Sequence, residues 1–215
     1  MTLITPLSMP SGAKDQVFEI QRVDYLAPEA RGRIGGVTAG FPLWKMTCTL
    51  GTLTVAQSDQ WRAFVSAQRG AQRLFMAFDI GRKMPRNYQA GFPSGFSGQA
   101  SGWSQSIDGN NFAILTLTGL PAGLSLVTGD YVQFSWGTFQ RALVRLVESA
   151  TVDGTGKLSA TIEPAVPALV PPSALASLAQ PCCLMKLTSD TKLGPVGRRG
   201  AIESGTIDAI QDLRP

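Results

Sequence analysis

Residues 55–78 read VAQSDQWRAFVSAQRGAQRLFMAF, and this stretch decides how the rest of the chain is interpreted. Ser58 is a typical helix N-cap, and Arg69 followed by Gly70 is a typical helix end. Between them, the residues that recur at three- and four-residue spacing share one helix face: Trp61, Phe64, Val65 and Gln68. The stretch therefore predicts an amphipathic α-helix over 58–69.

A strand is expected directly after this helix. Alternation over 73–78 places Leu74, Met76 and Phe78 on one face of that strand. Because an amphipathic helix must cover its apolar face, we expect the helix to lie across the sheet that contains this strand. The predicted central unit is thus a sheet with one packed helix.

The chain before the helix indicates two strands and a long loop. Residues 1–15 are rich in Pro, Ser and Thr and predict an extended arm, and 18–26 predicts the first strand. The glycine-rich, charged stretch 27–40 is typical of a hairpin loop that projects from a sheet. Residues 41–53 predict the returning strand. Its expected core-facing residues are Trp44, Met46, Cys48 and Leu50.

A second group of short strands follows a change of composition. Residues 80–102 have no apolar period and indicate a linker, whereas 112–187 contain strands separated by turn signals. Their spacing is that of a small barrel or sandwich. We expect a short helical turn over 173–178 and the closing strand of this group over 182–188.

The C-terminal residues predict how the two groups are divided. Residues 201–213 have strand character and are expected to re-enter the first sheet. The prediction is therefore one domain formed by 1–92 with 188–215, and an inserted domain formed by 93–187. The inserted segment is expected to be separable, so that a short linker in its place leaves a folded first domain.

The composition argues against catalysis and metal binding. The 215 residues include no histidine, so the chain lacks the commonest general base and the commonest transition-metal ligand. The three cysteines, Cys48, Cys182 and Cys183, have no CxxC spacing and are interpreted as small buried hydrophobes. We expect no enzyme activity, no cofactor and no metal site.

The same composition bears on membranes and compartment. The chain has no run of eighteen apolar residues, and its N-terminus lacks a basic region followed by an apolar one. We therefore expect no membrane span and no cleaved signal, and synthesis in the cytoplasm.

Two further patterns have alternative interpretations. Asp108, Asp130 and Asp153 could supply a carboxylate pair, but each lies in a turn signal, where aspartate bonds to the local backbone. Four aromatic residues either pack in the core, which is the preferred interpretation, or form a stacking surface for sugar or single-stranded nucleic acid. They are Trp103, Tyr131, Trp136 and Phe139.

The order of the expected elements, together with several stretches of sequence, resembles minor tail proteins of siphophages, especially distal tail proteins. The stretches RVDYLAPEARGRIGGVTAG (22–40) and WRAFVSAQRGAQRLFMAFD (61–79) carry the first part of the resemblance. The stretches LPAGLSLVTGDYVQF (120–134) and RALVRLVESATVDGTGKLSATIEP (141–164) resemble the small β-barrel of tail-tip and hub proteins.

This resemblance implies a mainly β fold, with a tube-type β-sandwich, one packed α-helix, and a small inserted β-barrel similar to an oligonucleotide/oligosaccharide-binding (OB) fold. It implies a structural component of the phage tail tip, a distal tail protein whose homomeric ring joins the tail tube protein to the hub and baseplate proteins. The ring is sixfold by analogy, DNA is only passing cargo, and the protein is assembled in the host cytoplasm into the virion. The alternative function is a carbohydrate-binding module for host-surface polysaccharide.

Three arginines are the expected contacts between subunits in such a ring. Arg31 and Arg33 lie in the predicted hairpin loop, and Arg69 lies at the predicted end of the helix. A solvated loop is the alternative interpretation of the same residues.

Overall fold

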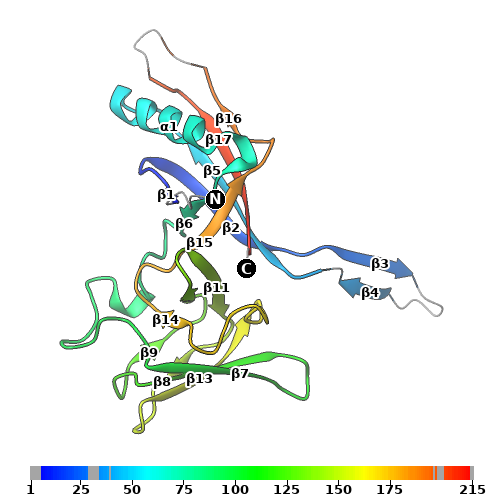
Figure 1. The fold of residues 1–215 in the computed structure, drawn as a ribbon, viewed down its shortest axis with the longest axis vertical. Coiled ribbons are helices and arrows are strands. Elements are labelled where there is room, and N and C mark those ends of the chain that lie inside the picture. The colour runs from blue at the N-terminus through cyan, green and yellow to red at the C-terminus, as the bar shows by residue number, and fades with distance from the viewer. Residues whose placement is uncertain (1–5, 29–33, 39, 196, 198–200, 214–215) are drawn as a thin grey trace.

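The computed structural model describes residues 6–28, 34–38, 40–195, 197 and 201–213. The protein is mainly β, with 42% of residues in strands and 10% in helices, which confirms the predicted class. The described residues contain one α-helix and several sheets, and two large sheets lie at opposite ends of the molecule (Figure 1).

The first large sheet contains both ends of the described chain. Six of its seven strands follow the order β1-β6-β15-β17-β5-β2, and the seventh, β16, pairs with β17 outside this path. The strands are β1 (Leu7–Ser8), β2 (Ala13–Gln21), β5 (Leu43–Leu50), β6 (Phe75–Ala77), β15 (Cys183–Leu187), β16 (Lys192–Leu193) and β17 (Gly205–Gln211). The pairs are antiparallel except β1 with β6. The expected return of the C-terminal segment to this sheet is confirmed, because β17 lies near its centre.

The predicted helix forms as α1 (Val55–Gln68), but it begins earlier than expected. Thr54 is the N-cap, and it forms a capping box with Gln57. The prediction of Ser58 as N-cap is wrong, since Ser58 is buried inside the helix and its hydroxyl accepts a hydrogen bond from Ile202 N at 2.8 Å. The predicted helix end is confirmed, because Arg69 adopts the left-handed conformation, with φ of 49°.

In the strand after the helix, β6, the face that packs in the core is not the predicted one. Phe75 and Ala77 are fully buried, whereas Leu74, Met76 and Phe78 are only partly buried. The ring of Phe75 packs edge-on against that of Phe64 on α1, with centroids 5.1 Å apart. Both sets of alternate residues are apolar, so periodicity alone does not distinguish them.

The N-terminal strands also depart in part from the prediction. The expected extended arm over 1–15 contributes β1, the start of β2 and the buried Met9, whose sulfur lies 3.8 Å from Cys48 Sγ. Trp44, Met46, Cys48 and Leu50 are all buried, as predicted. Burial raises the pKa of the Cys48 thiol to about 12, so this thiol behaves as an apolar core group.

The glycine-rich stretch forms paired strands rather than a loop alone. β3 (Asp24–Pro28) and β4 (Ile34–Thr38) make an antiparallel ribbon, which continues from β2 and leads back to β5. The ribbon extends away from the rest of the molecule (Figure 1), so the expected projection is confirmed. The predicted single strand over 18–26 is divided between β2 and β3.

The second large sheet has six strands in the order β14-β10-β11-β13-β8-β7. They are β7 (Gly102–Ile107), β8 (Ala113–Thr118), β10 (Tyr131–Trp136), β11 (Gln140–Leu146), β13 (Lys157–Glu163) and β14 (Leu175–Ser177), with β9 (Ser125–Leu126) paired to β12 (Ala150–Thr151) beside them. The two ends of this sheet are joined, because Ala100 N bonds to Ala176 O at 3.0 Å and Leu178 N bonds to Gly98 O at 2.7 Å. The predicted helical turn over 173–178 is wrong, since β14 occupies it.

The strand expected to close the second group belongs to the first sheet. β15 lies within the predicted range 182–188, but it pairs with β6 and β17. Its buried residues Cys183, Met185 and Leu187 join the core beneath α1. The linker expected over 80–102 contains a 3-10 turn, Arg86–Tyr88, and an isolated bridge between Gln99 and Ser177, before β7 begins at its end.

Candidate functional site

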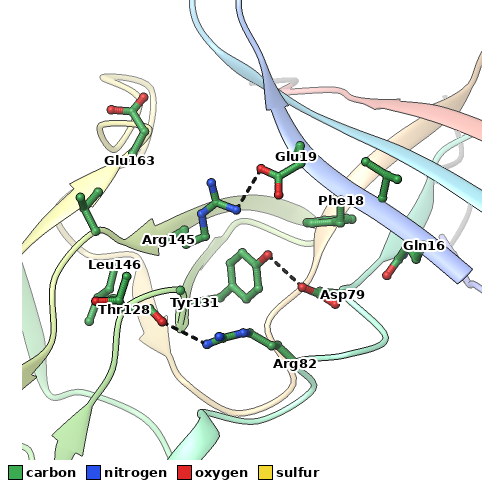
Figure 2. A pocket seen from close by; sticks show the side chains of 13 residues that line it. Gln16, Phe18, Glu19, Asp79, Arg82, Thr128, Tyr131, Arg145, Leu146 and Glu163 are labelled. Atoms are coloured by element: carbon green, nitrogen blue, oxygen red, sulfur yellow. Dashed lines mark hydrogen bonds and ion pairs between the residues drawn. The ribbon is translucent and has the colours of Figure 1, made fainter.

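A cleft of about 710 Å³ lies where the two large sheets meet (Figure 2). One wall is the edge strand β2, and the opposite wall is formed by β10, β11 and the turns beside them. The lining residues are Gln16, Val17, Phe18, Glu19, Asp79, Arg82, Thr128, Gly129, Tyr131, Arg145, Leu146, Val147 and Glu163.

Three aromatic rings form the base of this junction. Phe18 stacks on Trp44 with centroids 5.2 Å apart, and Tyr131 meets Trp44 edge-on at 5.5 Å. The Trp44 indole N–H donates to Leu143 O at 2.7 Å. Trp44 is fully buried, so its ring joins the two sheets and offers no free face to a ligand.

The phenol of Tyr131 is held as a neutral donor. Its hydroxyl donates to Asp79 Oδ2 at 3.0 Å (Figure 2). Burial, followed by the negative charge of Asp79, raises the pKa of Tyr131 well above its ordinary value. This hydrogen bond fixes the start of the connection between β6 and the second sheet against β10.

Ion pairs cross the cleft between segments that are far apart in sequence. Arg145 on β11 pairs with Glu19 on β2 at 3.0 Å, and Arg22 pairs with Glu163. The Arg145 guanidinium also lies over the Trp44 ring, 5.4 Å from its centroid. Glu19 and Arg22 are well exposed, so each pair contributes little to stability and mainly sets the orientation of the two walls.

A fully buried carboxylate anchors the far end of the cleft. Asp130 accepts from Arg82 Nη1, Arg86 N and Val127 N at 2.9–3.0 Å. Its side chain has no exposed surface, so all of its charge is compensated by these donors. The turn that carries Gly129 is thereby held against the connection after β6.

We expect Asp130→Asn to lower the free energy of unfolding by about 2–3 kcal/mol, because the Arg82 charge loses its partner and the amide cannot accept all three hydrogen bonds. Urea unfolding followed by circular dichroism measures the change. Asp153→Asn is the matched control, since Asp153 caps an exposed turn. Equal stability of the two variants would contradict the anchoring role of Asp130.

The carboxylate pair, which is the less favoured interpretation of these aspartates, does not form. Asp108 accepts from Asn110 N and Phe112 N, and Asp153 accepts from Thr155 N and Lys157 N. Each aspartate is therefore engaged with the backbone of its own turn, which confirms the preferred interpretation. Of the three, only Asp130 has an arginine partner.

The aromatic stacking surface, the less favoured interpretation of these rings, does not form either. Trp103 packs on Phe134 with centroids 4.7 Å apart, and its indole N–H donates to Ala174 O at 2.9 Å. Trp136 packs against the core of the second sheet, and Tyr131 is buried at the cleft. Core packing, the preferred interpretation, is confirmed for these rings, while Phe139 lies half-buried in the turn after β10.

Of the three predicted subunit contacts, the structure describes only Arg69, which does not line this cleft. Arg69 is exposed at the end of α1, where its backbone N–H bonds to Ser66 O. Arg31 and Arg33 lie outside the described residues. Sequence reasoning missed the cleft, because its lining residues come from five segments that share no motif.

Within the described ranges, no group of three or more Asp, Glu, Cys or His side chains is placed to hold a metal ion. In the same ranges, no helix has the length and apolar character needed to cross a membrane. No protein-family model matches this chain. A search of curated proteins also finds no significant match.

Proposed function

We propose that this protein is a structural component of a bacteriophage tail tip, of the distal tail type. In this proposal a homomeric ring joins the tail tube protein to the hub and baseplate proteins, and DNA passes through it as cargo. The observation that carries the proposal is an open seven-stranded sheet, covered by one helix, from which the β3–β4 ribbon projects (Figure 1).

The finer description of the fold belongs to the same proposal. The seven-stranded sheet with α1 corresponds to the tube-type sandwich that the resemblance implies. The six-stranded sheet, with its joined ends, corresponds to the small OB-like barrel. In tail proteins such a barrel serves as an architectural module, so no ligand is assigned to it.

The open edges of the first sheet give a physical reason for ring assembly. β2 lies at one edge and β1 at the other, and unpaired strand edges attract further strands. A head-to-tail arrangement of identical copies pairs unlike edges and closes when the rotation between neighbours divides a full turn. Sixfold closure follows the analogy with tail proteins and also forms a channel for DNA.

The expected assembly is a closed ring in the size range of a hexamer. Size-exclusion chromatography with light scattering measures its mass, and electron microscopy of the same fractions shows whether the particles are annular. A protein that stays monomeric at high concentration, and forms no ring when mixed with its tail partners, would contradict the proposal. Removing residues 28–38 is expected to weaken assembly while the monomer stays folded.

A further inference from the structure

The edge strand of the first sheet presents its backbone to the cleft. Among the described residues β2 pairs only with β5. The cleft is lined by four consecutive residues of β2, 16–19. Because successive side chains of a strand point to opposite faces, four residues in a row line one cleft only when the backbone edge itself faces it.

The hydrogen bonds of β5 show which backbone groups these are. Trp44 lies opposite Ile20, and its N–H turns away from β2 to bond Gln211 Oε1 at 3.2 Å. Antiparallel pairs alternate between bonded and non-bonded, so Phe18 also directs its N–H and C=O away from β5. Phe18 is 5% exposed, and in the described part of the chain these two groups have no hydrogen-bond partner.

These groups specify the chemistry of an occupant. Backbone donors and acceptors of a nearly buried residue such as Phe18 are costly when they have no partner, and another extended backbone satisfies them in register. At the far end, the Gln16 side chain already binds the backbone in this way, donating to Phe78 O at 3.0 Å and accepting from Ile80 N at 2.7 Å. The open part of the edge therefore fits an added strand.

The rim of the cleft suits apolar contacts with such a strand. Val17 on β2 is 60% exposed, and Val147 on the opposite wall is 49% exposed. The charged residues that line the cleft already have partners: Arg82 and Arg145 pair with carboxylates, Glu163 pairs with Arg22, and Asp79 accepts from the Tyr131 hydroxyl. An extended segment with small or apolar side chains thus matches the site better than a charged ligand.

The chain itself carries a segment of this kind. The β3–β4 ribbon makes its main contacts within itself, although a two-stranded ribbon is marginally stable alone. Tyr25 on the ribbon is 65% exposed, and two glycines on β4 allow close approach of another backbone. The ribbon leads away from its own chain (Figure 1), so only another copy brings a ribbon to the cleft.

We propose that the cleft beside β2 receives the β3–β4 ribbon of a neighbouring copy, which pairs with β2 as an added strand. The proposal rests on the proposed ring and names the surface through which its subunits bind. Ribbon and cleft are different surfaces, so the contact is head-to-tail and can propagate around a ring. The second sheet then takes part in assembly through the wall formed by β11.

Two complementary variants of the full chain test this contact. The first replaces residues 22–42 by Asn-Gly, which suits a tight hairpin because Gln21 lies opposite Leu43 as a hydrogen-bonded pair. It lacks the ribbon and keeps the cleft. The second, Val17→Arg, places a charge at the rim and keeps the ribbon. Ile107→Arg is the control, since Ile107 is 55% exposed on β7 and does not line the cleft.

Each of the two variants alone is expected to be a folded monomer by circular dichroism and light scattering. An equimolar mixture is expected to form a particle of twice the monomer mass, because one intact ribbon meets one intact cleft. Ile107→Arg is expected to assemble like the unchanged protein. A mixture of folded variants that stays monomeric, or a Val17→Arg protein that still forms rings, would overturn the proposed contact. The ring itself is judged separately, by the mass of the unchanged protein.

Discussion

Replacing Trp44 by alanine is expected to lower the free energy of unfolding by about 3–5 kcal/mol, the range for truncating a large buried aromatic side chain. The indole is fully buried, stacks on Phe18 and meets Tyr131 edge-on. The substitution leaves a cavity where the two sheets join and removes the donor to Leu143 O. Urea unfolding monitored by circular dichroism measures the loss.

A second substitution at the same position separates packing from hydrogen bonding. Trp44→Phe keeps an aromatic ring but cannot donate to Leu143 O, so we expect a smaller loss of about 1–3 kcal/mol from a buried carbonyl without its partner, together with a smaller cavity. If Trp44→Ala were as stable as the unchanged protein, the junction would not depend on this side chain. Equal losses in the two variants would assign the whole effect to the hydrogen bond.

Removing residues 93–187 is expected to prevent folding of the remaining chain. This segment contains β15, which lies between β6 and β17 in the first sheet. Without it, β6 and β17 have no common neighbour, and the core loses Cys183, Met185 and Leu187, each at most 3% exposed. The loss exceeds what a domain of this size can tolerate, since stability is typically about 5–15 kcal/mol in total.

Removing residues 78–182 instead is expected to leave a folded first sheet. Ala77 lies opposite Cys183 and directs its backbone groups toward it, so Ala77 and Cys183 can be joined by Asn-Gly in a two-residue turn. This variant keeps β15 but loses the cover that Tyr131 and Leu143 give to Trp44, and we expect a cooperative transition at lower stability. Absence of that transition would show that the two sheets share one core. A folded variant lacking 93–187 would contradict the role given to β15.

The elements α1, β5, β6 and β15 show where the sequence predicts the fold well and where it does not. The helix and β5 are predictable because one face of each is apolar and the other is polar. The order of neighbouring residues therefore indicates which side chains are buried. For β6 the prediction of the buried face fails, because Phe75 and Leu74 are both apolar and the choice depends on Phe64. For β15 the strand is predictable, but its partners are not.

The sequence by itself determined the mainly β class, the position of α1, most strands and the projection of the glycine-rich stretch, since turn residues and periodicity act over a few positions. Only the tertiary structure decided which strands pair and where the cleft lies. Glu19 and Arg145 are 126 residues apart, and Trp44 and Gln211 are 167 apart, yet each pair is in hydrogen-bond contact. Such contacts depend on how the chain closes its sheets, because a strand's local pattern identifies its buried face but carries no information about which distant strand will lie beside it.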